Sequence, residues 1–397
     1  MKQGWEIKKL GDIAKFYRGL TYSKGDEVPS STNMVLRSNN VDLETNALVY
    51  DDMKCLREDL LVDEDKKVKA NSILICMSNG SKQHIGKVAY IQDNIDYAFG
   101  GFMGLIVPTK DIEGKYLYYS CVSHHFKHFL AGIGNGIGIT NLRFSDLSSY
   151  CVPVPPIAEQ EKIVAELDCL SGIIEKKKQQ LKELDALAQS IFYEMFGDPV
   201  ENDKGWETAK LKDSVVEMFL GPFGSALKTE CYVDKDASYC MVYEQKHAIR
   251  KTLNLETHYI NQSKYNELKR FEVHSGDFIM SCRGTIGEIY RLPNDAPMGI
   301  IHPSVMKIRI KEDIYNPIFF NRLLSRIIKN ETTSGNCVQM AITAKELGAR
   351  KPILPPLKIQ QDFASKIESI EKQKELIAQS IKETETLFNS RMDYYFN

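Results

Sequence analysis

Hydrogen-bonding side chains gather in several short loops of this chain. In the first half they are Arg37, Asn39, Asn40, Ser78, Asn79, Ser81, Lys82, Gln83, His84, Asn135 and Asn141. In the second half they are Lys228, Glu244, Gln245, Lys246, His247, Arg283, Thr285, His302, Ser304, Asn336 and Gln339. Arg and Lys pair with guanine, and Asn and Gln with adenine, in the major groove of DNA, while Lys and Arg also bind phosphates. We therefore predict that these loops bind DNA.

The two sets of loops occupy matching places in two halves of the chain, yet their residues differ. Any exposed loop is polar, so a solvated surface is the alternative reading of each residue taken alone. The helical segments of the two halves agree where the loops diverge. Duplicated frames with different loops predict two units that bind different ligands.

A second chemistry is suggested by the sequence NPIF from Asn316 to Phe319, which is close to the NPPF motif of adenine methyltransferases. Ile318 stands where the second proline belongs, and no glycine loop for S-adenosylmethionine precedes the motif. The alternative is that Asn316 caps a helix and Pro317 occupies its first turn. We favour the helix cap, and we predict that the chain is not itself an enzyme.

Two further motifs have structural alternatives that we prefer. The alternating glycines Gly132, Gly134, Gly136 and Gly138 lack the Lys-Ser/Thr and the strand-turn-helix context of a phosphate-binding loop. Cys121, His124, His125 and His128 supply only one arm of ligands, whereas metal sites usually draw on two paired arms. We interpret the glycines as a loop and the histidines as packing or surface residues, and we predict no metal site.

Two long helices must position these loops, one from Pro153 to Phe196 and one from Pro352 to Phe396. Their apolar residues recur with a period near 3.5, which is typical of a coiled coil. This seam consists of Ile163, Leu167, Leu170, Ile174, Leu181, Leu184 and Ile191 in the first helix, and of Phe363, Ile367, Ile370, Ile377, Ile381 and Phe388 in the second. About 40 residues at 1.5 Å each give roughly 60 Å, too long for an ordinary surface helix. Polar residues at seam positions, among them Lys177, Lys374 and Arg391, are expected to fix the register.

A tandem repeat sets the domain organisation. Trp5 and Trp206 each follow a glycine and open one half of the chain. We predict head one over residues 1–152, the first helix over 153–197, head two over 198–352 and the second helix over 353–397. Each head has an α+β composition: strands are expected in 71–91, 98–108, 275–292 and 299–310, and helices in 113–133 and 316–330.

The order of these parts predicts their geometry. A short linker joins the first helix to head two, and the second helix follows head two directly. Because domain termini usually lie close together, the second helix should run back along the first. The expected fold is two recognition heads separated by an antiparallel two-helix coiled coil, with approximate two-fold symmetry.

Bulk composition narrows the class of protein. The net charge of −2 offers no overall attraction to nucleic acid, so any basic surface must be local. Nine cysteines without a CxxC pair are typical of a reducing cytoplasm, where we expect the protein to reside. Neither a signal peptide nor an apolar run of about 20 residues is apparent, so we expect no membrane association.

Several short motifs recur in or mark the two halves: the Gly-Trp-Glu openings, GPFGSALK at 221–228, GTIGEI at 284–289, the Pro-Pro helix entries followed by Gln160 and Gln360, and FYEMFGDP at 192–199. In these motifs the whole chain resembles the specificity subunit of type I restriction-modification systems. Head one lacks a GPFG segment. The alternatives are a fused adenine methyltransferase-specificity protein and a coiled-coil scaffold without DNA specificity.

That resemblance implies a function and a set of partners. Each head would be a target recognition domain that reads one half of a bipartite sequence in double-stranded DNA. The coil would set the gap between the halves and would dock two methyltransferase subunits, and restriction subunits would complete the complex. S-adenosylmethionine, ATP and Mg²⁺ would belong to those partners, and no cofactor is expected in this chain.

Overall fold

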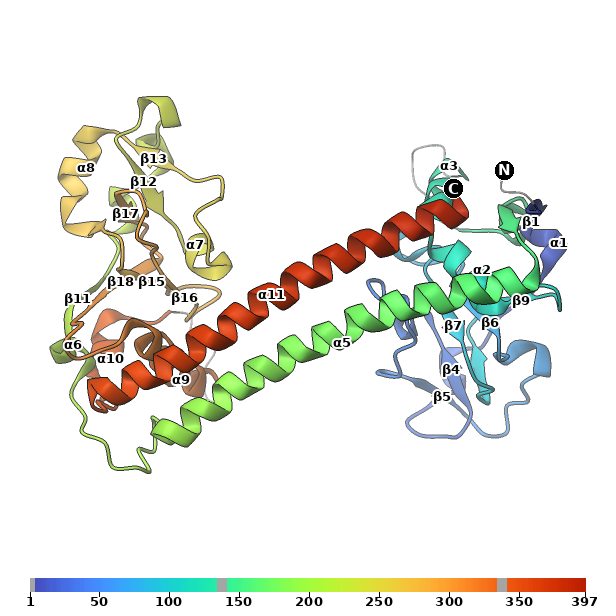
Figure 1. Ribbon diagram of the computed structural model, residues 1–397, viewed down its shortest axis with the longest axis horizontal. Helices are drawn as coiled ribbons and strands as arrows, with labels where there is room; N and C mark the ends of the chain where they lie inside the picture. Colours follow the sequence, from blue (N-terminus) through green and yellow to red (C-terminus); the bar gives the residue numbers. More distant parts are fainter. Residues whose placement is uncertain (1–3, 134–140, 334–340) are drawn as a thin grey trace. The chain divides into compact units, whose positions relative to one another are not determined.

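The computed structural model describes residues 4–133, 141–333 and 341–397. They form two compact units (Figure 1). Unit 1 comprises Met1–Gln179 and Ala378–Asn397, and unit 2 comprises Gln180–Ile377. Each unit therefore contains one head and part of both long helices. Within the described residues, no helix is both long and apolar enough to cross a lipid bilayer.

Head one contains two four-stranded sheets. The first is antiparallel, in the order β2 (Ala14–Arg18), β9 (Met103–Pro108), β6 (Ser72–Cys76) and β7 (Val88–Ile91). The second has the order β3 (Glu27–Val28), β5 (Lys54–Leu56), β4 (Met34–Leu36) and β8 (Tyr97–Phe99), with β4 and β8 parallel. A separate ribbon pairs β1 (Glu6–Lys9) with β10 (Cys151–Val154), which ties the start of the head to its end.

Head two repeats this plan with its own strands. Its antiparallel sheet has the order β11 (Val215–Leu220), β18 (Val305–Ile310), β15 (Phe278–Ser281) and β16 (Ile289–Arg291). The second sheet has the order β13 (Tyr259–Ile260), β12 (Cys240–Tyr243), β17 (Gly299–Ile301) and β14 (Glu272–Val273), with β12 and β17 parallel. The predicted duplication is thus present in the sheets as well as in the helices.

The shorter helices frame the sheets. In head one they are α1 (Leu10–Ile13), α2 (Gly114–Val122), α3 (His124–Ile133) and α4 (Phe144–Ser148). In head two they are α6 (Leu211–Ser214), α7 (Gln245–Arg250), α8 (Gln262–Leu268), α9 (Pro317–Thr333) and α10 (Ala344–Ala349). The single helix predicted over 113–133 is wrong, because Ser123 divides it. The Ser123 hydroxyl donates to the Ser120 carbonyl and accepts from the Phe126 N–H, so it ends one helix and caps the next.

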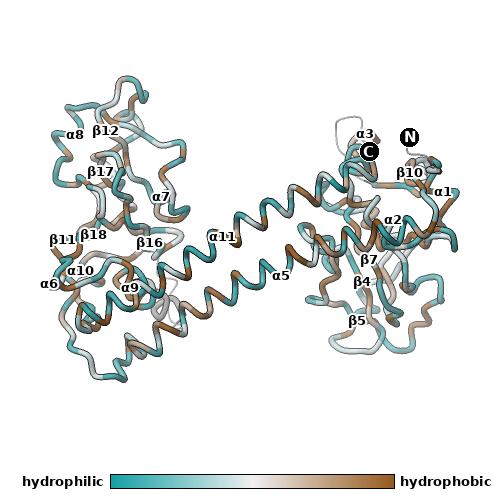
Figure 2. Tube along the Cα trace, in the orientation of Figure 1, coloured by the Kyte–Doolittle hydropathy of each residue, from teal (hydrophilic) through white to brown (hydrophobic). Residues whose placement is uncertain are grey.

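The two proline-headed helices are α5 (Ile157–Phe196) and α11 (Leu357–Phe396), each 40 residues long. In unit 1, Glu166 of α5 binds Arg391 of α11, and Lys177 donates to Ser380. In unit 2, Lys374 of α11 lies 2.7 Å from the Asp185 carboxylate of α5. Residue numbers rise along one helix as they fall along the other, so the pair is antiparallel, as predicted. Both helices alternate apolar and polar residues along their length (Figure 2).

The polar seam residues all have partners across the coil. Arg391 binds both carboxylate oxygens of Glu166, and Tyr395 donates to the same carboxylate. The Arg391 guanidinium, followed by the Tyr395 hydroxyl, holds the pKa of Glu166 below its usual value. Lys177 reaches the hydroxyls of Ser380 and Thr384. Such paired polar positions disfavour a slipped register, because a slip would leave them without partners.

The apolar seam residues differ in burial along the coil. Ile163, Leu167, Phe363, Ile367, Ile370 and Ile381 are buried, while Leu170, Ile174, Leu181, Leu184, Ile191, Ile377 and Phe388 are partly buried. Phe192 and Phe196 are fully buried, although neither belongs to the predicted seam. They leave the seam because the end of α5 packs into head two, where the Phe196 ring lies 4.6 Å from Phe319 and 5.3 Å from Phe363.

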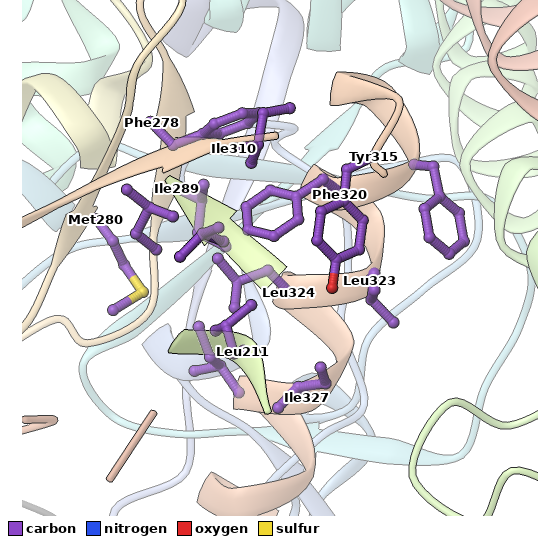
Figure 3. Close-up of a cluster of buried hydrophobic side chains, with 14 of the residues drawn as sticks. Leu211, Phe278, Met280, Ile289, Ile310, Tyr315, Phe320, Leu323, Leu324 and Ile327 are labelled. Atoms are coloured by element: carbon purple, nitrogen blue, oxygen red, sulfur yellow. The ribbon is translucent and has the colours of Figure 1, made fainter. Parts of the chain in front are cut away.

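That contact belongs to the core of unit 2, where the inner face of the antiparallel sheet packs on α9 (Figure 3). Phe278 and Met280 come from β15, and Phe320 and Leu324 come from α9. In unit 1 the matching core joins Tyr116 of α2 to Leu167 of α5. Each head therefore shares its core with both long helices, so head and coil fold as one body within a unit.

Two buried glutamines attach the heads to the starts of the long helices. The Gln160 side chain accepts from the Glu113 N–H and donates to the carbonyls of Asp111 and Pro155. Gln360 accepts from the Asn316 N–H and donates to Ile314 and Pro355 in the same way. Both side chains are fully buried and use their donors and acceptors. The repeated glutamine therefore fixes the direction in which each helix leaves its head.

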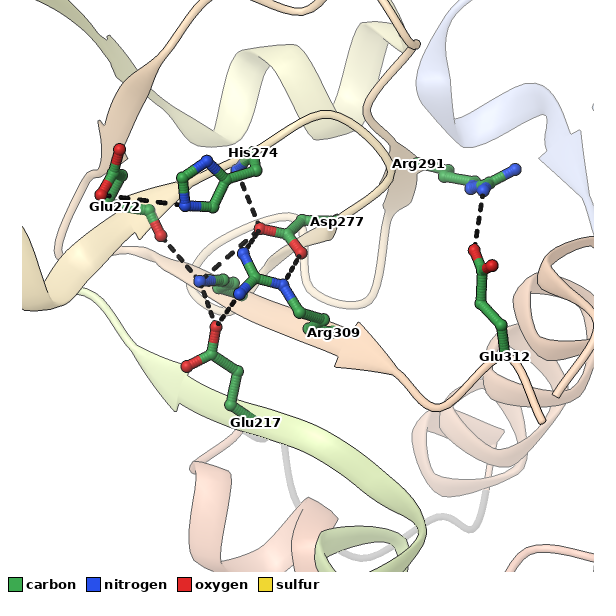
Figure 4. A network of polar contacts seen from close by, with 8 residues as sticks. Glu217, Glu272, His274, Asp277, Arg291, Arg309 and Glu312 are labelled. Carbon is green, nitrogen blue, oxygen red and sulfur yellow. Dashed lines mark hydrogen bonds and ion pairs between the residues drawn. The ribbon is translucent and has the colours of Figure 1, made fainter. Parts of the chain in front are cut away.

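Head two also contains a partly buried ion network that joins β11, β18 and the residue before β15 (Figure 4). Arg309 forms two hydrogen bonds to Asp277, at 2.6 and 2.7 Å. Lys307 binds Glu217 and lies 3.6 Å from Asp277. Asp277 and Lys307 are only 2% and 3% exposed. The Ile73–Ile106 pair of head one corresponds to the Phe278–Ile308 pair of head two. The positions of Asp277, Lys307 and Arg309 are therefore occupied in head one by Ser72, Leu105 and Val107.

Candidate nucleic-acid interface

Each head presents one loop between matching strands. In head one it runs from Met77 to Ile85, between β6 and β7, and in head two from Cys282 to Ile286, between β15 and β16. Each loop closes with the same hydrogen bond, from Gly86 to the Cys76 carbonyl and from Gly287 to the Ser281 carbonyl, both 2.8 Å. The two loops therefore stand on the same frame, although the loop of head one is longer.

Both closing glycines are required by their surroundings. Gly86 has φ +83° and Gly287 has φ +86°, a conformation that L side chains rarely adopt. A Cβ would lie 2.3 Å from Leu130 of α3 at the first position, and 2.4 Å from Ile328 of α9 at the second. Each loop therefore packs directly against a helix, and only glycine fits at the point of contact.

Hydrogen bonds at the loop bases identify equivalent positions in the two heads. The Met77 N–H donates to the Phe102 carbonyl, and the Cys282 N–H donates to the Ser304 carbonyl, both at 2.9 Å. Ser78 bridges to Asn141, and Arg283 bridges to Ala341. Ser78 therefore corresponds to Arg283, and Phe102 corresponds to Ser304. The frames are the same, and the side chains that they present differ in chemistry.

In head one the predicted residues Arg37, Asn39, Ser78 and Asn79 line one cavity of about 530 Å³. Asn79 donates to the Ser38 hydroxyl at 2.8 Å, which links the β6–β7 loop to the turn after β4. Arg37 binds the Asp52 carboxylate at 3.0 Å and the Asp52 carbonyl. Its Nε is buried without a hydrogen-bond partner among the described residues. The cavity thus combines amide and guanidinium groups suited to base edges.

The other predicted residues of head one have different surroundings. Ser81, Lys82, Gln83 and His84 follow Asn79 in the same loop, and Lys82 and Gln83 are exposed. Asn141 is exposed at the bridge to Ser78. Asn40 does not belong to the surface: it is fully buried, and its amide donates to the carbonyls of Val49 and Asp51. We therefore exclude Asn40 from the interface.

In head two a second polar cluster forms around Glu244. Its carboxylate lies 2.8 Å from Lys246 and 3.1 Å from the His258 ring. Burial favours a higher pKa, but Lys246 and His258 outweigh it and hold the pKa of Glu244 below its usual value. His302 shares a 2.8 Å hydrogen bond with Ser304. Burial lowers the pKa of His302, so its ring is neutral near pH 7 and can both donate and accept.

After burial, the positive charges of Arg283 and Lys246 also lower the pKa of His302, while Glu244 opposes them. Arg283 and Thr285 are exposed in the β15–β16 loop. Gln245 is partly buried at the start of α7. Lys228 is exposed before the short turn Thr229–Cys231, and no contact links it to the cluster among the described residues.

His247 differs from the prediction. It is fully buried, and its Nδ1 accepts from the Glu244 N–H at 2.9 Å, so the ring closes the first turn of α7. Burial lowers its pKa, so the ring is neutral. We exclude His247 from the interface. Asn135, Asn336, Gln339 and most of the glycine-rich loop lie outside the described residues.

Sequence reasoning missed several members of these clusters. His258 binds Glu244, and its ring stacks on Tyr232 with centroids 4.1 Å apart. Phe102 lines the same cavity as Arg37 and Asn79. Its place in an apolar run, AFGGFMGLIVP, favours a strand and conceals its exposure. The two glycines immediately before it were the available signal, since glycine is frequent in tight turns.

The alternative chemistries do not gain support. The Asn316 side chain accepts from the Ile318 N–H at 2.9 Å, so it caps α9 as predicted. His124 pairs with Asp393, and the His125 ring packs near Tyr150. In the parts of the chain that the structure describes, no three His, Cys, Asp or Glu side chains gather as a metal site.

Comparison with known proteins places this architecture. The family described as "Type I restriction modification DNA specificity domain" matches twice, over residues 2–186 and 204–386. The Escherichia coli K12 EcoKI specificity subunit is 22% identical, over 93% of this chain and 82% of its own length. The putative MjaX specificity subunit of Methanocaldococcus jannaschii is 25% identical, over 93% and 87%.

Solved structures share the fold. A chain from a study of complex assembly and conformational transition of the type I R-M system has a TM-score of 0.67 at 16% identity, and the match covers 100% of this chain and 98% of that one. The S subunit from M. genitalium has a TM-score of 0.53 at 13% identity, with coverage of 99% and 96%. These likenesses show that the fold is shared, and the two family matches over residues 2–186 and 204–386 show that the chain belongs to the type I restriction-modification DNA specificity family.

Proposed function

We propose that this chain is the DNA-reading subunit of a type I restriction-modification complex, in which each head recognises one half of a bipartite sequence. The observation that carries the proposal is the pair of matched frames with unlike loops. Ser78 stands where Arg283 does, and Phe102 where Ser304 does. Base edges are distinguished by hydrogen-bond pattern and by the thymine methyl group. Two heads with such different side chains would select different half-sites.

The long helices set the gap between the half-sites in this proposal. Forty residues at 1.5 Å per residue give roughly 60 Å, which exceeds the ~34 Å of one DNA turn. Two methyltransferase subunits would dock on the coil and heads, and restriction subunits would join them. S-adenosylmethionine, ATP and Mg²⁺ would bind to those partners, and this chain would be non-catalytic. The complex would reside in the cytoplasm. A net charge of −2 suits a subunit that shares DNA binding with partners.

Deleting the gene should erase one bipartite methylated motif from the genome of its host. Long-read methylome sequencing of the deletion strain, with and without a plasmid copy of the gene, measures this directly. A catalytically inactive methyltransferase partner provides the control, because it should erase the same motif. A methylome that keeps every motif after deletion would contradict the proposed function.

Replacing Arg283 with Ala should relax recognition at one half-site. A good bidentate contact between arginine and guanine contributes about 1–3 kcal/mol of discrimination. We therefore expect discrimination at one base pair of one half-site to fall about 5- to 150-fold, with the other half-site unchanged. Competition binding with single-base variants of the target, using the assembled methyltransferase complex, measures the effect.

The exposed Arg270, in the same head but outside the Glu244 cluster, provides the matched control. Arg270→Ala should weaken binding to all sequences equally or not at all. Equal loss of discrimination at both half-sites in Arg283→Ala would indicate a folding or docking defect instead.

A further inference from the structure

An exposed aromatic ring is fixed at the rim of the head-one cavity. Phe102 is 72% exposed, which is unusual for so large an apolar side chain. Its backbone is well held: the carbonyl accepts from the N–H groups of Met77 and Ser78, at 2.9 and 3.2 Å. The turn that contains Phe102 is closed by a 2.8 Å hydrogen bond from the Met103 N–H to the Gly100 carbonyl. The ring is therefore presented to solvent from a rigid position.

The surroundings of this ring point to a nucleobase. Phe102 lines the same cavity as Arg37, Asn39 and Asn79, whose side chains suit the hydrogen-bonding edges of bases. The Gly100–Met103 turn packs tightly on Thr21, which follows β2, since a Cβ on Gly101 would lie 3.2 Å from the Thr21 hydroxyl. Phe102 is thus an apolar side chain exposed to water among polar side chains that suit base edges. Exposure of a large apolar ring to water is unfavourable, so contact with a ligand would account for it.

The equivalent position of head two has the opposite chemistry. Ser304 occupies it and shares a hydrogen bond with His302. A phenyl ring and a hydroxyl on the same backbone frame cannot recognise the same base feature. This position is therefore suited to distinguish the half-sites of the two heads.

We propose that Phe102 is a specificity-determining residue that contacts the 5-methyl group of a thymine in the half-site bound by head one. Thymine alone among the four bases presents an apolar group in the major groove, and a phenyl ring offers no hydrogen bond to the others. The neighbouring amides and guanidinium then read the flanking bases. This inference rests on the proposed function and adds the base that one residue selects.

Substituting deoxyuridine for thymine tests the contact, because it removes the methyl group and leaves base pairing intact. Duplexes carrying the methylome-defined target would have each thymine replaced singly, and binding to the assembled methyltransferase complex would be measured by competition. With the native chain, replacing one particular thymine of one half-site should lower the affinity about fourfold, as expected for the loss of one buried methyl group. With Phe102→Ala, binding to the unmodified target should fall, and sensitivity to that thymine should disappear.

Leu61→Ala provides the matched control, because Leu61 is a 92% exposed apolar residue of the same head that does not line the cavity. It should leave the deoxyuridine pattern unchanged. Three outcomes would overturn the inference. The target could contain no thymine in either half-site, or the Phe102→Ala complex could keep the native sensitivity to deoxyuridine. The variant could also lose the ability to kink DNA, which would show that the ring inserts between base pairs instead. If the assembled complex binds no bipartite target specifically, the proposed function itself fails.

Discussion

Removing residues 171–177 together with 380–386 should shorten the gap between the two half-sites by about three base pairs, with both half-sites unchanged. Seven helical residues span about 10.5 Å, and base pairs are about 3.4 Å apart. The two stretches belong together, because Lys177 of one donates to Ser380 and Thr384 of the other. The paired deletion therefore removes a whole polar contact and leaves none of its members buried alone.

A whole heptad also keeps the apolar seam in phase on both helices. Methylome sequencing of cells carrying the shortened chain reads the new gap directly. Deletion of 171–177 alone is the control, because it shifts α5 against α11 and breaks the pairing of Glu166 with Arg391 or of Asp185 with Lys374. That variant should methylate no bipartite motif. An unchanged gap in the paired deletion would refute the spacing role of the coil.

Asp277→Ala should destabilise head two by about 3 kcal/mol, because it removes one of the two carboxylates that neutralise the buried Lys307 and the partly exposed Arg309, and leaves both cations to Glu217 alone. Arg309 loses both hydrogen bonds to the carboxylate, and Lys307 keeps only Glu217 and the Glu272 carbonyl. Lys307 is 3% exposed, so water cannot hydrate its ammonium group unless the sheet opens. Urea unfolding of the full chain, followed by hydrogen exchange in peptides from each head, would locate the loss in head two.

Head one supplies a stringent control for this prediction. The triple variant Asp277→Ser, Lys307→Leu and Arg309→Val introduces the residues found at its matching positions, and it should recover most of the lost stability. Buried ion pairs are often replaceable by apolar residues of similar volume, whereas a half-removed pair is not. A loss below about 1 kcal/mol for Asp277→Ala would show that the network is effectively solvated, like an exposed ion pair.

Local periodicity was enough to predict the long helices. The positions from Ile163 to Phe388 follow a heptad pattern whose information lies within a few residues, and α5 and α11 end where expected. They begin at Ile157 and Leu357 rather than at the predicted Pro153 and Pro352, because the residues up to each Pro-Pro pair are not helical. The repeated Gln160 and Gln360 likewise mark the two helix entries before their contacts are known. The order of heads and helices then implied an antiparallel pair, because a short linker restricts where the second helix can begin.

The ends of the helices were less predictable for a physical reason. Phe192 and Phe196 turn away from the seam because head two provides an apolar core there, with Phe319 in contact. Ser123 breaks a predicted helix, because its hydroxyl binds the local backbone. Tertiary packing and side-chain caps override periodicity at such points.

The sequence by itself determined that the chain is duplicated, that long helices link its heads, and that polar loops differ between the halves. Only the tertiary structure decided which loop residues share a surface. Asn40 and His247 are polar yet buried, because folding directs their side chains to backbone partners. Phe102 is apolar yet exposed, because hydrogen bonds to Met77 and Ser78 hold its turn at the cavity rim. The exposure of Phe102 depends on its pairing with the loop after β6, a segment distant in the chain, and no local pattern encodes that pairing.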